Sequence, residues 1–205
     1  MPLATPPEGI EIIQRWEGWH RALPDGRAKP YYCPAKVVTI GYGSTYWLDG
    51  SPIKITDEAI TQEIGKQLLL RQLQTYTNAV DRAVKVPIHP QMRAALISLA
   101  YNIGTAAIAK STLIRRVNAR DWAACPAAFK MWRNGGGRVL TGLLNRRIDE
   151  AALFMRGVAK LSEVATVSPA SIKSAAPPLD AGPSWWQQIV QGILNGLRPQ
   201  RPSPA

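Results

Sequence analysis

The middle and the end of the chain carry apolar residues at helical spacing. Over residues 56–87 an apolar side chain returns every three or four positions, and Thr56 precedes two acidic residues, which predicts one long helix with Thr56 as its N-cap. The segment 90–104 begins with proline, ends with glycine and is apolar round most of its circumference, which indicates a buried central helix. The same period predicts further helices in two segments, 111–121 and 138–155.

Shorter and more varied patterns occupy the N-terminal part. Thr5 has the chemistry of an N-cap and Glu8 stands at the capping-box position, so we predict a short helix that ends near Gly18. A β-branched run at 36–40 predicts a strand, and the turn-rich segment 48–56 predicts a hairpin with a short second strand. The expected fold class is α+β and mainly helical, with a small N-terminal lobe containing a short antiparallel sheet, a long connecting helix and a helical C-terminal lobe.

The composition changes after residue 158. We expect residues 1–158 to form the folded domain and residues 159–183, rich in Ser, Ala and Pro, to form a linker. In residues 184–205 apolar side chains fall on one helical face and arginines follow, which predicts a short amphipathic helix and a basic tail. Two interpretations of this helix stay open: transient contact with the inner or outer membrane through residues 185–201, or docking on its own domain or a neighbouring chain.

Composition limits the functions to consider. The 205 residues are enough for one ordinary domain with some left over, and no apolar run reaches the roughly 18–20 residues of a membrane span. The first residues lack the basic and apolar regions of a signal peptide, so we expect synthesis as a cytosolic protein. The net charge of +11 favours a polyanionic partner such as nucleic acid, anionic lipid or an acidic cell-wall polymer, unless the protein is simply basic and soluble.

The cysteines and histidines give little sign of a metal site. Cys33, Cys125, His20 and His89 lack the spacing of zinc ligands, so we expect neither metal nor cofactor. We expect Cys125 to be a buried structural residue. A disulfide between the two cysteines stays an alternative that a reductant would reveal through raised activity.

One glutamate stands where an acid catalyst of glycosidic cleavage needs to be. Such a reaction usually uses one protonated carboxyl group for the leaving oxygen and a second group that supplies a nucleophile or orients water. Glu17 lies at the end of a short apolar helix beside Trp16, and such a desolvated setting keeps a carboxyl group protonated near neutral pH. The alternative is that Glu17 is a solvated or ion-paired residue at a helix end.

Five blocks of sequence together resemble a known family. "RWEG", "CPAKVVTIGYGST", "ALISLAYNIG", "STLIRRVNARD" and "GGGRVLTGLLNRRIDEAALF" are similar, in this order, to the phage-type lysozymes of glycoside hydrolase family 24, in the lambdoid endolysin branch. The resemblance covers residues 9–157 and leaves the tail outside. It implies a lysozyme-like fold and a muramidase that hydrolyses the β-1,4 bond between N-acetylmuramic acid and N-acetylglucosamine for host cell lysis.

The resemblance also implies roles for residues. Glu17 matches the family's catalytic glutamate and acts as general acid, while Thr39 holds the attacking water. Cys33, six positions before Thr39, stands where many relatives carry a second acidic residue, and it orients the water or helps to deprotonate it. Since a free thiol with a reference pKa of about 8.5 is mostly neutral at pH 7, Cys33 either has a perturbed pKa or acts mainly by positioning the water. The alternative is a small buried side chain at a strand start.

Three more residues are placed by position in the family. Arg146 lies where relatives pair an arginine with the glutamate, and such a pair favours the ionised carboxylate, opposing desolvation. Tyr42 and the backbone around Gly43 are expected to border the sugar cleft.

One feature departs from the family. Fifteen residues separate Glu17 from Cys33, more than relatives usually have. A surface loop can lengthen at little thermodynamic cost, so both groups can keep their places. Asp25 in this segment is an alternative second carboxylate, or simply a turn former in Pro-Asp-Gly.

Partners and location follow from the same resemblance. We expect a monomer that binds peptidoglycan, has no specific nucleic-acid partner, accumulates in the host cytoplasm and reaches periplasmic peptidoglycan after holin-type release. Alternatives are a lytic transglycosylase acting on the same bond, a catalytically idle peptidoglycan-binding protein and, third, a nucleic-acid binder with strongly salt-dependent affinity.

Overall fold

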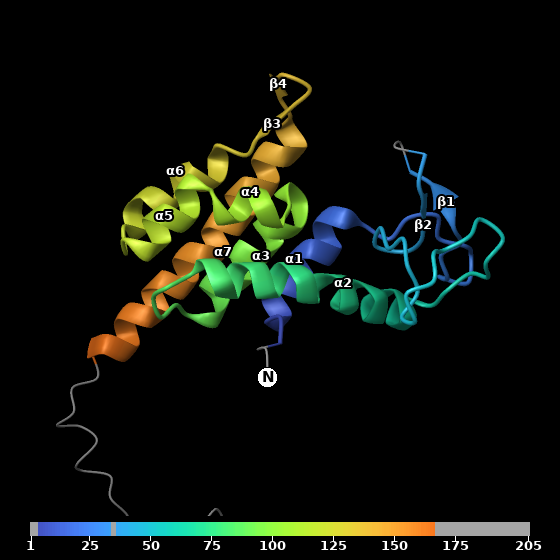
Figure 1. Ribbon diagram of the computed structural model, residues 1–205, viewed down its shortest axis with the longest axis horizontal. Coiled ribbons are helices and arrows are strands. Elements are labelled where there is room, and N and C mark those ends of the chain that lie inside the picture. Colours follow the sequence, from blue (N-terminus) through green and yellow to red (C-terminus); the bar gives the residue numbers. More distant parts are fainter. Residues whose placement is uncertain (1–3, 34–35, 167–205) are drawn as a thin grey trace, which may run out of the picture. The chain divides into compact units, whose positions relative to one another are not determined.

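The computed structural model describes residues 4–33 and 36–166 of the chain (Figure 1). Nearly all of them belong to one compact unit, Met1–Val164, and a second unit comprises Ala165–Ala205. The first unit combines many helices with two small antiparallel sheets. This confirms the expected α+β, mainly helical class.

The N-terminal lobe and the connecting helix come first in the chain. Their elements are α1 (Pro7–Glu17), β1 (Tyr31–Tyr32), β2 (Val38–Thr39) and α2 (Gln62–Ala83). The helical lobe contains α3 (Pro90–Ile103), α4 (Thr105–Ala109), α5 (Thr112–Asn118), a 3-10 turn (Trp122–Ala124), α6 (Cys125–Lys130), β3 (Asn134–Gly135), β4 (Arg138–Val139) and α7 (Thr141–Thr166). Figure 1 shows β1 and β2 at one end of α2, with the other helices gathered round α3.

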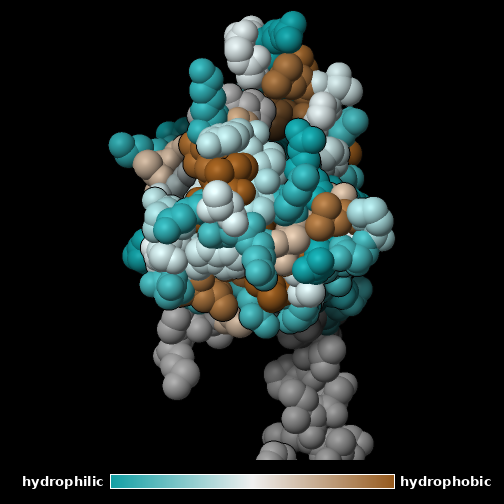
Figure 2. Space-filling view, turned by 90° about the vertical axis from the view of Figure 1, so that its right-hand side faces the viewer, coloured by the Kyte–Doolittle hydropathy of each residue, from teal (hydrophilic) through white to brown (hydrophobic). Residues whose placement is uncertain are grey.

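The sheet of the N-terminal lobe is very small. β1 and β2 pair antiparallel, with Tyr31 opposite Thr39, so the strand predicted at 36–40 forms in shortened form. The second strand predicted in 48–56 is reduced to one isolated bridge between Tyr46 and Pro52. A few apolar side chains hold the lobe together: Ile40, Ile53, Ile60 and Leu68. Figure 2 views the molecule from the side of this lobe and shows apolar side chains among hydrophilic ones.

The long helix begins later than its sequence pattern predicts. Thr61, not Thr56, is its N-cap, and the Thr61 hydroxyl accepts a hydrogen bond from the backbone of Ile64. Asp57 does not lie in the first turn of the helix. Its carboxylate accepts a hydrogen bond from the indole of Trp47 at 2.8 Å and another from the backbone of Lys54, which closes a turn. The predicted cap of α1 is also wrong: Pro6 holds that position without a side-chain hydrogen bond.

Helix α3 is the centre of the core, as its sequence predicts. Every residue from 91 to 100 is buried, and α1, α2 and α4 all pack against this helix. Gly157 of α7 allows a close approach as well, since a Cβ there would lie 2.7 Å from the backbone nitrogen of Met92. The packing against α3 therefore fixes where α1 and α7 lie relative to each other.

Helix α7 begins at Thr141 and not at the predicted residue 138, because Arg138 and Val139 pair with β3. It continues to Thr166, so the first residues of the segment expected as linker are helical. The predicted remainder of the linker, the amphipathic helix of 184–205 and the membrane contact of 185–201 lie outside the described residues. Within the described part of the chain, no helix is both long and apolar enough to span a bilayer.

Candidate functional site

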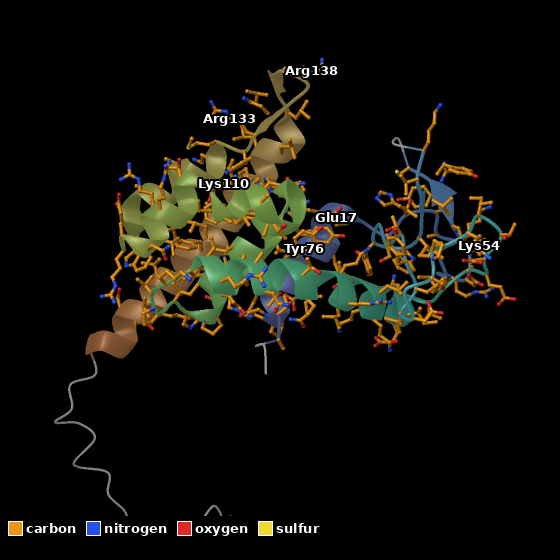
Figure 3. All side chains as sticks on the ribbon, in the orientation of Figure 1. Glu17, Lys54, Tyr76, Lys110, Arg133 and Arg138 are labelled. Atoms are coloured by element: carbon orange, nitrogen blue, oxygen red, sulfur yellow. The ribbon has the colours of Figure 1, made fainter. Side chains whose placement is uncertain are left out.

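Glu17 is the last residue of α1. Gly18 ends the helix with a φ of 75°, a conformation that suits glycine, and its N–H donates to Gln14 at 3.0 Å. The Glu17 side chain is 26% exposed, which leaves the carboxylate partly open to solvent (Figure 3). The sequence therefore presents one accessible carboxylate at a rigid helix end.

Arg146 of α7 holds this carboxylate. Its Nη1 donates to Glu17 Oε1 at 2.7 Å, and the arginine itself is 4% exposed. Arg146 Nε donates to Glu150 Oε1 at 3.2 Å and Nη2 to the Ser98 carbonyl at 3.5 Å. The structure thus brings Glu17 and Arg146 together, although 129 positions separate them in sequence.

Glu150 is the hub of the hydrogen bonds around Arg146: it is a buried acceptor that Ser98, Arg146 and Arg147 all contact. It is fully buried, and its Oε1 accepts from Ser98 Oγ at 2.7 Å and from Arg147 Nη2 at 2.9 Å. Arg147 Nε also lies 2.7 Å from Glu150 Oε2, an ion pair whose geometry is too bent for a hydrogen bond. Burial raises the pKa of Glu150, and the charge of Arg147 and the Ser98 hydroxyl oppose that rise.

The hub was missed by the sequence interpretation. Its signal is the pattern of two adjacent arginines followed by a glutamate, since Arg146, Arg147 and Glu150 fall within reach at helical spacing. Ser98 gave no signal, because it lies on α3, 52 positions away from Glu150.

Tyr101, which was not predicted as a site residue, interacts with the glutamate and packs against a second tyrosine, Tyr76. The rings of Tyr76 and Tyr101 meet edge to face with centroids 5.1 Å apart. Burial raises the pKa of Tyr101 well above its ordinary value, and the negative charge of Glu17 adds to the effect. Both effects favour the neutral phenol of Tyr101.

Cys33 and Thr39 belong to the hairpin of β1 and β2. The Cys33 backbone N–H donates to Val37 at 3.0 Å, which extends the pairing by one step toward the turn. Thr39 is 6% exposed, and its hydroxyl donates to the Tyr31 carbonyl at 3.3 Å. Because this bond uses the hydroxyl proton, the Thr39 oxygen is left as an acceptor. In the described residues, no hydrogen bond joins Glu17 to either Cys33 or Thr39.

The loop after β2 is tightly built. Tyr42 is 8% exposed and packs on Trp19 with ring centroids 4.9 Å apart, so most of its surface is used in the core. Gly43 has a φ of 90°, which permits the turn that joins Ile40 to Ser44.

Asp25 has the contacts of a turn former. Its carboxylate accepts from the backbone of Arg27 at 3.0 Å and from Arg27 Nε at 2.8 Å. These hydrogen bonds, the backbone one first, hold the pKa of the exposed Asp25 below its ordinary value. All its polar contacts in the described residues are therefore local, and none involves Glu17, Cys33 or Thr39.

Comparison with known proteins places the chain in a family. The family model for phage lysozyme matches residues 14–150. The endolysin of Salmonella phage P22 is 35% identical over 147 residues, covering 72% of this chain and 94% of that protein. The endolysin of Bacillus phage B103 is 33% identical over 170 residues, covering 81% of this chain. This chain spans 59% of the B103 protein and 55% of the endolysin of Bacillus phage PZA.

Solved structures agree with this placement. The endolysin from Escherichia coli O157:H7 phage FAHEc1 superposes with a TM-score of 0.66 at 33% identity, covering 75% of this chain and 94% of that one. A P22 lysozyme variant superposes with a TM-score of 0.65, also at 33% identity, covering 75% of this chain and 99% of that one. The common fold and the match from residue 14 to residue 150 show that this chain belongs to the phage lysozyme family.

Proposed function

We propose that this protein is a muramidase of the endolysin type, which hydrolyses the β-1,4 bond between N-acetylmuramic acid and N-acetylglucosamine in peptidoglycan. The observation that carries the proposal is the pair of Glu17 and Arg146, a partly accessible carboxylate held at 2.7 Å by a buried arginine. Relatives of this chain from several phages are named endolysin, which supports the same activity.

Glu17 acts as the general acid. Arg146 binds Oε1, and within the described residues Oε2 has no hydrogen-bond partner. The proton on Oε2 passes to the glycosidic oxygen as the bond from that oxygen to the anomeric carbon breaks. Arg146 then stabilises the carboxylate that this transfer leaves behind.

In the proposed reaction, Thr39 and Cys33 of the hairpin position the attacking water. The Thr39 oxygen, whose proton is used by the Tyr31 carbonyl, accepts a hydrogen bond from the attacking water. As the new carbon–oxygen bond forms, the water gives up one proton: either Cys33 orients the water and the proton passes to solvent, or Cys33 takes up the proton as a thiolate. The product is a reducing N-acetylmuramic acid end.

Single substitutions test these roles on purified Gram-negative sacculi. Glu17→Gln is expected to lower the rate of turbidity loss by about 10²–10⁴-fold, the usual contribution of a general acid. Glu11→Gln, an exposed change on the same helix, is the matched control and is expected to leave the rate unchanged. Equal activity of both variants, with circular dichroism showing both folded, would remove Glu17 from the mechanism.

The hairpin roles need a second set of variants. Cys33→Ser and Thr39→Val are expected to slow hydrolysis, and Cys33→Asp is expected to restore it by supplying a carboxylate. Loss of activity with Asp25→Asn alone would transfer the second role to Asp25. Anhydro-muramic products would identify a lytic transglycosylase, and binding to sacculi without any release would identify an idle binding protein.

We also propose how the enzyme reaches its substrate, the peptidoglycan of the host. The enzyme is made in the host cytoplasm as a monomer, and a separate membrane lesion releases it to the peptidoglycan. Its charge of +11 attracts it to anionic wall polymers rather than to a specific nucleic acid. Expression without a holin is expected to leave cells intact, and spontaneous lysis during normal growth contradicts this release step.

A further inference from the structure

A surface hollow lies beside the hairpin of the N-terminal lobe. Its volume is about 610 Å³, and its lining residues are His20, Arg21, Tyr31, Tyr32 and Cys33. Sites for small ligands typically enclose about 300–1,000 Å³, so this hollow has room for a sugar with a substituent. Since Cys33 belongs to the lining, the hollow adjoins one of the two residues to which the proposed mechanism assigns the water.

One wall of the hollow comes from the long segment between Glu17 and Cys33. The segment is tied down by backbone hydrogen bonds between Ala28 and Ile60 in both directions, at 2.9 and 2.8 Å. A further bridge joins Ala22 to Ala28. The added residues are therefore anchored, and they present a defined surface rather than a loose bulge.

Among residues 4–33 and 36–166, no carboxylate pairs with the arginine of the hollow. Arg21 is exposed, and within the described residues its side chain has no hydrogen bond or ion pair. The nearest carboxylate in its segment, Asp25, is already paired with Arg27 at 2.8 Å. An arginine left free in this way is suited to bind a carboxylate from a ligand with its guanidinium fork.

The hollow also offers aromatic surface. Tyr32 is 60% exposed, and the ring of Tyr31 packs against His20 with centroids 5.7 Å apart. Tyrosines present an apolar face with a polar tip, which suits a ligand that has carbon–hydrogen faces and hydroxyl groups. A sugar ring has this chemistry.

We propose that this hollow is a subsite for the peptide-bearing part of the substrate, with Arg21 binding a carboxylate of the acidic stem peptide and Tyr32 packing against a sugar ring. This inference rests on the proposed muramidase function. It adds a specificity that the catalytic residues do not provide: preference for glycan that still carries its peptides.

The test compares two substrates that differ only in the peptide. Solubilised peptidoglycan is used with its stem peptides and after their removal by an amidase. Arg21→Gln is expected to lower kcat/KM about fivefold on the peptide-bearing glycan, the size expected for one partly exposed ion pair, and to leave the peptide-free glycan unaffected. Arg120→Gln is the matched control, since Arg120 is also exposed and has a φ of 57° against 55° for Arg21.

The aromatic part has its own control pair. Tyr32→Ala is expected to raise KM on both substrates, whereas Tyr46→Ala, which removes a tyrosine 56% exposed, is expected to change neither. Titration of the protein with a disaccharide peptide and with the bare disaccharide measures binding without catalysis. The peptide is expected to tighten binding to the wild type and not to Arg21→Gln.

Each failure has a distinct result. If the wild type cleaves both glycans and Arg21→Gln acts on both as the wild type does, or loses activity equally on both, the subsite is overturned and the muramidase function stands. If the wild type cleaves neither glycan, the muramidase function fails, and the binding titration decides the subsite. Equal affinity of the wild type for the two disaccharides overturns the subsite in either case.

Discussion

Replacing Glu150 by glutamine is expected to destabilise the protein strongly. The glutamate is fully buried between α7 and α3 and contacts three donors: Ser98 Oγ at 2.7 Å, Arg147 Nη2 at 2.9 Å and Arg146 Nε at 3.2 Å. Glutamine keeps the shape of the side chain but removes its charge. It also turns one acceptor oxygen into an N–H₂ group that faces arginine donors.

The loss of stability expected for Glu150→Gln follows from the two buried arginine charges that it leaves without their counterion. Arg147 is fully buried and Arg146 is 4% exposed, so both charges lose their buried counterion, and only the partly exposed Glu17 remains for Arg146. Removing one partner of a buried ion pair costs about 3–5 kcal/mol. For a chain of this length, each kcal/mol lowers Tm by about 2–4 °C.

Urea unfolding followed by tryptophan fluorescence measures this loss. Asp149→Asn is the control on the neighbouring residue, whose ion pair with Arg15 at 2.6 Å is exposed and is expected to contribute about 0–1 kcal/mol. Glu150→Gln is expected to shift the midpoint far more than Asp149→Asn, with the slope unchanged. Equal small losses for both variants would refute the role of Glu150 as the hub.

Two further predictions concern packing and thiol chemistry. Gly157→Ala is expected to destabilise by about 1–3 kcal/mol, because its Cβ would lie 2.7 Å from the Met92 backbone, whereas Gly142→Ala on the same helix has open space and is expected to be neutral or slightly stabilising. Thermal melts of the two variants check the difference, and equal melts contradict it. Burial raises the pKa of Cys125 to about 12, so at pH 8 its thiol is expected to resist a maleimide or disulfide reagent until urea is added, while the partly exposed Cys33 reacts in the folded protein. Fast reaction of two thiols without denaturant contradicts that burial.

Local signals were sufficient for α3 and α5 of the helical lobe, but they missed α4, α6 and the pairing of β3 with β4. α3 has its proline at the start and Gly104 after its end, and its apolar circumference matches a helix that is buried throughout. α5 has a true cap, since the Ser111 hydroxyl accepts from the backbone of Ile114 at 3.1 Å. In these two segments the local pattern predicts the helix that the structure shows.

Local signals failed where distant residues compete. Thr56 and Thr61 are both threonines followed closely by acidic residues, so the sequence does not separate them as caps. The choice is made by Trp47, whose indole uses the Asp57 carboxylate and keeps that segment in a turn. Hydrogen bonds between separate elements are not visible in a periodicity.

The candidate site also has one part that local sequence predicts and one part that depends on contacts between distant residues. Its hairpin half is local, because Cys33 directly follows β1 and Thr39 lies six positions later in β2. Its helical half depends on α1 and α7 meeting through α3, so the contact of Glu17 with Arg146 was reached only through the family resemblance.

In the proposed mechanism, water attacks a glycosidic bond whose oxygen Glu17 protonates. The most direct measurement is digestion of purified sacculi by the wild type in ¹⁸O-labelled water, followed by mass spectrometry of the released fragments. We expect reducing N-acetylmuramic acid ends that carry the label, and almost no fragments from Glu17→Gln. Unlabelled anhydro-muramic ends would contradict it, because the sugar's own hydroxyl would then be the nucleophile.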